Sequence, residues 1–184
     1  MGMAAERNIM RRILLVDDEV NVLNALVRAM RQHVQIEDLR IETFTDPFDA
    51  LTRCAEVSFD VVISDFRMPQ MTGVEFLHAI KESAPTTVRM ILSASTEFTT
   101  VTSAINEAQV FRYIPKPWQV GDLQENLRMA LLERDKLLAD QRLSDALRLK
   151  AGCLTPQEQE AKVLEQEEPG LTKVNWGPNG EILL

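Results

Sequence analysis

Short aliphatic runs alternate with segments of helical spacing along most of this chain. Apolar runs of a few residues predict five β-strands, at residues 12–16, 39–44, 59–63, 88–92 and 110–114. Apolar residues that recur every three or four positions predict helices at residues 20–33, 47–55, 73–83, 98–107 and from 119 to about 150. This alternation indicates an α/β fold, in which helices cover both faces of a mostly parallel sheet.

The third of these strands runs into a carboxylate, Asp65. Pro69 and Gly73 then mark a loop before the next helical segment. A charge beside a buried strand is unfavourable unless it is paired or used. Ligands of open α/β sheets bind just outside the carboxyl ends of the strands, so Asp65 is the natural centre of a candidate site.

Other polar residues also follow strand ends. Asp17 and Asp18 follow the first strand, Ser93 the fourth and Lys116 the fifth. Crowded carboxylates repel one another and take up protons, whereas Mg²⁺ would allow them to stay ionised. Asp65 could then act as a nucleophile that forms an aspartyl phosphate, while a lysine and a hydroxyl hold the phosphoryl oxygens.

Each of these residues also has an ordinary interpretation. Asp17 and Asp18 are favourable at a helix N-terminus, and Ser93 or Lys116 alone would be a turn residue or a solvated charge. Their joint placement at one sheet edge favours the phosphoacceptor site. A phosphatase of the haloacid dehalogenase type is an alternative, but it requires Asp-x-Asp after the first strand and leaves Asp65 unexplained.

Four segments in this order resemble the receiver domains of two-component response regulators: Leu14–Glu19, Ser64–Pro69, Ile91–Ala94 and Tyr113–Trp118. The resemblance covers about residues 11–132. It implies a flavodoxin-like fold, a doubly wound five-stranded parallel sheet of strand order 2-1-3-4-5. The segments from Phe66 and Phe111 further resemble receivers that precede HD-GYP phosphohydrolase domains, although we expect no such domain in this chain.

The resemblance also implies a role for each site residue. Asp65 is the expected phosphoacceptor. The expected Mg²⁺ ligands are Asp18, Asp65 and the backbone carbonyl of Arg67, with Asp17 acting through water. Lys116 and Ser93 are the expected partners of the phosphoryl group, Tyr113 is the aromatic residue that changes rotamer on activation, and Lys116–Pro117 is often a cis peptide in the family.

The implied function is a signalling module rather than an enzyme in the usual sense, since it would catalyse only its own phosphorylation and dephosphorylation. A histidine kinase or phosphotransfer protein would donate the phosphoryl group, and the switched surface would contact a downstream protein. A degenerate receiver that acts only as a scaffold is a further alternative, and absence of Mg²⁺ binding would favour it.

The composition indicates which compartment and which binding partners to expect. The chain has 184 residues and a net charge of −8, which argues against a large nucleic-acid-binding surface. Cys54 and Cys153 are its only cysteines, too few for a disulfide framework. No apolar run approaches the roughly 20 residues of a membrane span. We therefore expect a reduced, cytoplasmic protein that binds neither membrane nor nucleic acid.

We expect four parts: a leader (residues 1–11), the receiver domain (12–132), a helical extension (133–150) and an acidic helix with a β-hairpin tail (151–184). Leucines on the extension should not remain in water. Either two chains form a homodimer through the extended last helix, or the tail folds back on it. Leu132, Ala139, Leu143 and Ala146 form a seam, but Lys136 interrupts it, so a strict coiled coil is not expected.

Overall fold

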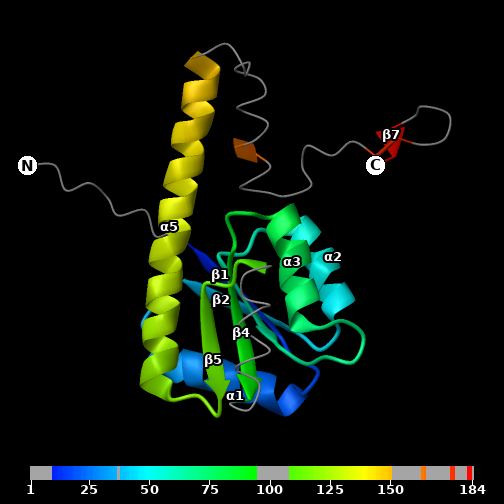
Figure 1. Ribbon diagram of the computed structural model, residues 1–184, viewed down its shortest axis with the longest axis vertical. Helices are drawn as coiled ribbons and strands as arrows, with labels where there is room; N and C mark the ends of the chain where they lie inside the picture. The colour runs from blue at the N-terminus through cyan, green and yellow to red at the C-terminus, as the bar shows by residue number, and fades with distance from the viewer. Residues whose placement is uncertain are drawn as a thin grey trace, which may run out of the picture.

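The computed structural model describes residues 10–36, 38–94 and 108–150, together with 163–164, 175–176 and 182–183 (Figure 1). Its strands are β1 (Arg11–Val16), β2 (Leu39–Phe44), β3 (Val61–Asp65), β4 (Val88–Ala94), β5 (Arg112–Lys116), β6 (Asn175–Trp176) and β7 (Ile182–Leu183). Its helices are α1 (Val20–His33), α2 (Pro47–Glu56), α3 (Gly73–Ser83) and α5 (Val120–Lys150).

The first five strands form one parallel sheet in the order β2-β1-β3-β4-β5, which confirms the flavodoxin-like arrangement. The central strand β3 is buried along its whole length. In Figure 1, α5 lies on one side of the sheet, with α2 and α3 on the other. One apolar core joins the sheet to α1 and α5, and a second joins it to α2 and α3. All carboxyl ends of these strands therefore meet at one edge.

Local sequence signals set the starts of the helices. The Asp46 carboxylate accepts a hydrogen bond from the backbone N–H of Phe48, and Pro47 occupies the first turn of α2. Thr72 and Glu75 form a capping box at the start of α3, which satisfies two backbone donors. These caps fix where the chain turns from loop into helix.

Some boundaries differ from the sequence prediction. β3 and β5 each begin and end two residues later than predicted, and β4 continues to Ala94. Backbone pairing continues beyond the apolar stretch, because Asp65 pairs with Leu92 and Lys116 with Ala94. β1 begins at Arg11, which was assigned to the leader.

Other predictions concern the last third of the chain. α5 matches the predicted long helix, and β6 and β7 pair in antiparallel fashion as the hairpin requires. Of the acidic helix only residues 163–164 are described, and they are helical. The helix predicted at 98–107 lies outside the described residues. Within the described part of the chain, no helix has a stretch long and apolar enough to cross a bilayer.

A network of charges anchors α5 at the opposite, amino-terminal edge of the sheet. Arg11 donates two hydrogen bonds to the Asp135 carboxylate, at 2.8 and 2.9 Å. Asp60 accepts from the backbone N–H of Arg12 at 2.8 Å and from Nε of Arg134 at 3.4 Å. Arg134 is only 5% exposed, so its charge depends on Asp60 for compensation. The network ties the middle of α5 to the starts of β1 and β3.

Gly73 lies against the end of β3. A Cβ added there would be 1.9 Å from the backbone oxygen of Asp65, and backbone cannot move aside as a side chain can. We expect Gly73→Ala to lower the free energy of unfolding by at least about 2 kcal/mol, measured by urea denaturation.

Gly121→Ala is the matched control for this prediction, because a Cβ there meets nothing within 4 Å. We expect it to change stability by less than about 1 kcal/mol. Equal losses of stability in the two variants would contradict the role assigned to the close contact at Gly73.

Candidate functional site

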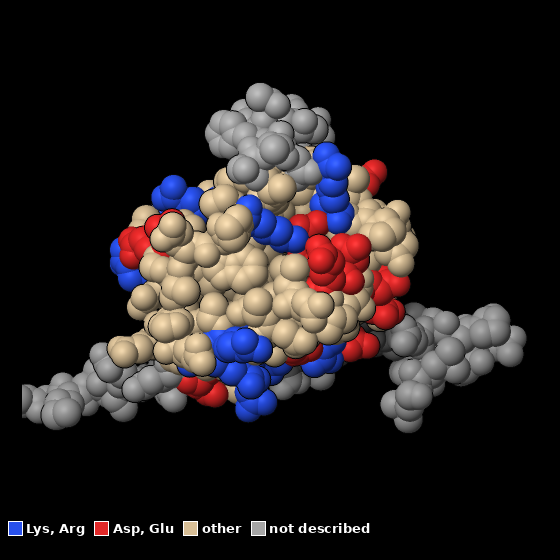
Figure 2. Space-filling model, turned by 90° about the horizontal axis from the view of Figure 1, so that it is seen from below, with Lys and Arg blue, Asp and Glu red and all other residues tan. Residues whose placement is uncertain are grey.

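The carboxyl ends of β1, β3 and β5 bring together Asp17, Asp65 and Lys116. Nζ of Lys116 donates to Oδ2 of Asp17 at 2.7 Å and also contacts Oδ1 of Asp65. Figure 2 looks onto this side of the molecule and shows acidic side chains gathered in one part of it, next to basic ones. Three of the predicted site residues thus form a single ionic cluster.

Both carboxylates of the cluster are largely removed from water. Asp17 is 0% exposed and Asp65 is 7% exposed. Oδ1 of Asp17 accepts from the backbone N–H of Glu19 at 2.9 Å, and Oδ2 of Asp65 accepts from that of Arg67 at 2.7 Å. Each carboxylate therefore has one oxygen on the backbone and one on the ammonium of Lys116.

Burial and charge act in opposite directions on this cluster. Burial raises the pKa of Asp65, and Asp17 adds to this, while the hydrogen bond and charge of Lys116 oppose it; the net direction is upward. Burial lowers the pKa of Lys116, but the hydrogen bonds to Asp17 and Asp65 outweigh it and the net pKa is raised. The lysine is therefore held as a cation.

Asp18 and Arg67 lie beside this cluster, and the side chains of both are exposed. Among the described residues, no three His, Cys, Asp or Glu side chains are grouped as a metal site. The Lys116 ammonium instead lies between Asp17 and Asp65. The available donors are carboxylate and carbonyl oxygens, which fit Mg²⁺ by their hardness. The ligand roles of Asp18 and the Arg67 carbonyl stay predictions.

Ser93 and Tyr113 connect the site to the outer strands. Ser93 is buried and follows Leu92, the residue paired with Asp65. The Tyr113 hydroxyl donates to the backbone oxygen of Ser93 at 3.1 Å and lies 3.4 Å from that of Ala94. The side chain of Tyr113 is thus tied to the end of β4, directly beside the candidate site.

Two features of the site were not predicted from the sequence. The direct hydrogen bond from Lys116 to Asp17 is one of them, while the expected role of Asp17 at the metal through water stays a prediction. Gly73 supports the backbone of Asp65, and only its position after a proline-containing loop hints at this. The cis peptide bond at Lys116–Pro117, implied by the resemblance, is confirmed.

Two curated relatives match most of this chain. The hydrogenase transcriptional regulatory protein HoxA of Cupriavidus necator is 34% identical over 119 residues, which cover 65% of this chain and 24% of HoxA. A protein-glutamate methylesterase/protein-glutamine glutaminase of Hahella chejuensis is 32% identical over 160 residues, 86% of this chain and 43% of the relative. The chain spans less than half the length of both relatives.

Solved structures and family models agree with this comparison. The signal receiver domain of an HD domain-containing protein from Pseudomonas fluorescens Pf-5 is 29% identical and superposes with a TM-score of 0.66, covering 74% of this chain and 96% of that one. Residues 13–128 match the model of the response regulator receiver domain. This match covers more than half of the chain and agrees with the strand order and ionic cluster described above. It shows that the chain belongs to the receiver domain family of two-component response regulators.

Proposed function

We propose that this chain accepts a phosphoryl group on Asp65 from a histidine kinase or phosphotransfer protein, and that the modified site switches a surface for a downstream protein. The contact of Lys116 with the Asp65 carboxylate carries this proposal. It combines a nucleophile with a fixed cation at the sheet edge where ligands bind.

The proposed reaction uses the carboxylate of Asp65 as the nucleophile. A carboxylate oxygen attacks phosphorus, a new O–P bond forms, and the bond from phosphorus to the donor breaks. Asp17, Asp18, Asp65 and the Arg67 carbonyl would hold Mg²⁺, which neutralises negative charge on the phosphoryl oxygens. Lys116 stays in contact with Asp17 and supplies an ammonium to one phosphoryl oxygen. The Ser93 hydroxyl lies beside the site and would bind another.

The switch would use the contact between β4 and β5. Movement of Ser93 toward a phosphoryl group displaces the backbone to which Tyr113 is bonded. Release of that bond frees the Tyr113 ring to change rotamer. The surface formed by β5 and α5 would change as a result, and another protein would bind it.

The alternative of a haloacid dehalogenase-like phosphatase is less well supported. Its nucleophile would be Asp17, the first acid after β1. Asp17 is fully buried, and it lacks the Asp-x-Asp spacing that such a phosphatase requires, because Asp17 and Asp18 are adjacent. Asp65 is more open, and it is the better nucleophile by position. The first experiment below distinguishes our proposal from the alternative of a scaffold that is not phosphorylated.

The first prediction concerns the nucleophile. Acetyl phosphate with Mg²⁺ should add one phosphoryl group, labile to alkali and hydroxylamine, to the chain, detected by intact mass. Asp65→Asn should abolish the addition, because an amide is not a carboxylate nucleophile. Asp49→Asn, an exposed acid on α2, is the control and should be labelled like the parent. Equal labelling of Asp65→Asn and the parent would exclude Asp65, and an unlabelled parent would favour the scaffold.

The second prediction concerns the raised pKa of Asp65. A carboxylate whose pKa is raised by folding binds its proton more tightly in the folded state, so it opposes folding when it is ionised. Asp65→Asn removes this penalty and should be more stable than the parent at pH 7.

The advantage of Asp65→Asn should shrink as the pH falls through the pKa of Asp65, because protonation then relieves the parent of the same penalty. Urea denaturation at pH 7 and pH 4.5 measures it. A variant less stable than the parent at pH 7 would show that the ion pair with Lys116 outweighs burial.

The third prediction concerns coupling. Lys116→Ala should leave the chain folded but reduce the conformational response to phosphorylation, because no ammonium holds the phosphoryl oxygen. Trp118 is partly buried against the core next to Lys116, and its fluorescence reports the response in a Trp176→Phe background. Beryllofluoride with Mg²⁺ serves as the phosphoryl mimic. A fluorescence change as large as that of the parent would refute the coupling role.

A further inference from the structure

One side of α5 carries a regular stripe of exposed residues, here called the outer stripe. Its members recur every three or four positions, and all are exposed: Val120, Gln124, Arg128, Leu132, Asp135, Ala139 and Leu143. Leu132 is 53% exposed and Leu143 is 62% exposed, unusually open for leucines on a long helix. The stripe extends about 35 Å along the helix. It is separate from the site around Asp65.

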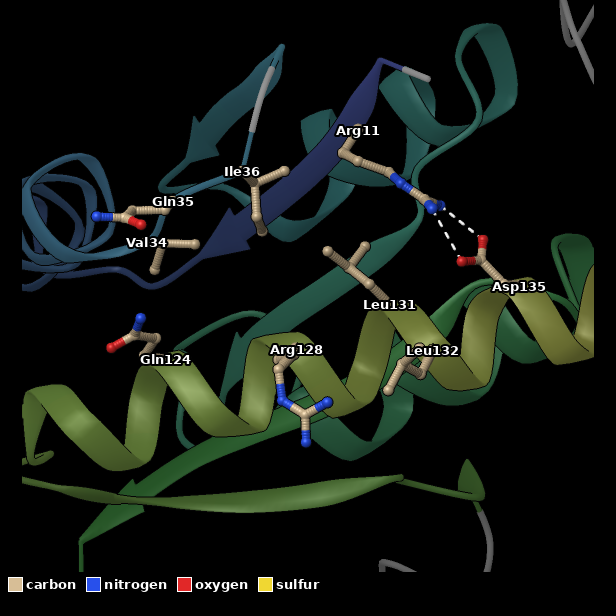
Figure 3. Close-up of a pocket in the computed structure, with 9 residues that line it drawn as sticks. All are labelled: Arg11, Val34, Gln35, Ile36, Gln124, Arg128, Leu131, Leu132 and Asp135. Atoms are coloured by element: carbon tan, nitrogen blue, oxygen red, sulfur yellow. Dashed lines mark hydrogen bonds and ion pairs between the residues drawn. The ribbon is translucent and has the colours of Figure 1, made fainter. Parts of the chain in front are cut away.

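A cavity of about 260 Å³ adjoins the middle of the outer stripe. Figure 3 shows Leu131 of α5 pointing toward Ile36, which follows α1, while Leu132 also lines the cavity but does not point toward Ile36. Arg128 and Asp135 lie on the helix on either side of these leucines. The molecule therefore presents an exposed leucine and an apolar hollow next to each other, with one basic and one acidic residue flanking them.

We propose that a second copy of this chain binds to the outer stripe and the adjoining cavity, with the two α5 helices antiparallel around a two-fold axis beside Leu131 and Leu132. Such an axis places each residue of the stripe opposite a different residue of the partner. Arg128 then faces Asp135 of the other copy, and Val120 faces Leu143 of the other copy. Gln124 faces the small residue Ala139.

The charges select this arrangement over a parallel one. In a parallel pair, Arg128 would face Arg128 and Asp135 would face Asp135, and like charges in an interface are unfavourable. In the antiparallel pair both contacts join opposite charges. Leu132 of each copy lies next to the cavity of the other, so the contact between leucine and cavity occurs twice.

Both charged residues are available for the contact. Arg128 is 59% exposed, and its ion pair with Glu125 three residues away is a surface interaction that contributes little. Asp135 is 48% exposed and keeps lone pairs beyond its bonds to Arg11. A partner Arg128 can therefore join Asp135 without breaking the network that anchors α5.

The arrangement also gives a role to the length of α5. The first part of α5 lies along the sheet and its last part continues beyond it (Figure 1). Val120 and Gln124 belong to the first half of the helix, and Ala139 and Leu143 to the second. In the antiparallel pair each extension lies along the domain helix of the other copy. A helix that ended near Leu132 would lack Asp135, Ala139 and Leu143, and so one partner of each of these three pairs.

The first test reverses charges in the full chain and measures dimerisation by sedimentation velocity. The parent should dimerise at tens of micromolar. Arg128→Asp and Asp135→Arg should each raise the dissociation constant at least about tenfold, because like charges then face each other. The double variant should recover most of the affinity, since opposite charges face again. Circular dichroism checks that each variant is folded.

Asp140→Arg is the matched control, because this exposed acid lies on α5 outside the outer stripe. It should leave the dissociation constant unchanged. A monomeric parent would overturn the proposal and leave the tail of the same chain, or another protein, as the occupant of the stripe. A double variant as weak as the single ones would exclude the antiparallel pairing.

The second test measures orientation directly, in a background in which Cys54 and Cys153 are replaced by alanine. Val120→Cys and Leu143→Cys chains are mixed and treated with a short bis-maleimide. The antiparallel pair predicts cross-links between the two variants and none within either variant alone. A Leu143→Cys chain that cross-links to its own copy would indicate a parallel pair and overturn the proposal.

Discussion

The ammonium of Lys116 between two buried carboxylates is the interaction on which the candidate site depends most. Without a cation, Asp17 and Asp65 would repel each other in a region almost closed to water, and one would take up a proton. Lys116 removes that repulsion and joins the ends of β1, β3 and β5. The charge that relieves the repulsion between Asp17 and Asp65 is therefore the same charge that a phosphoryl group would meet. Structure and chemistry are not separable at this residue.

Much of the fold was predictable because hydrophobic periodicity determines where helices and strands can lie. α1 and α3 have the predicted bounds, since apolar residues of both helices recur at helical spacing and a capping box or a strand end precedes them. Strand ends were less predictable. Asp65 and Lys116 are polar, yet both lie within strands, because backbone pairing with the neighbouring strand β4 continues past the apolar residues.

The contacts that the sequence did not predict join residues far apart in the chain. Lys116 and Asp17 are separated by 99 positions, and Arg11 and Asp135 by 124. Strand order indicates which edges meet, and so it grouped Asp17, Asp65 and Lys116 correctly. Which oxygen accepts which hydrogen bond depends on strand register and side-chain rotamers, and no periodic pattern encodes these. The support of Asp65 by Gly73 is a contact of the same kind.

The anchoring of α5 by Arg134 and Asp135 has a mechanical consequence. The anchor divides the helix into two arms of similar length, one from Val120 against the sheet and one that continues to Lys150. A hydrogen-bonded helix bends little, so both arms must tilt by the same angle about a fulcrum at the anchor. A tilt of about 10° would move the end of the outer arm, about 22 Å away, by about 4 Å. The charge network is thus the point about which α5 would tilt, and the half of α5 that packs on the sheet begins just after the site.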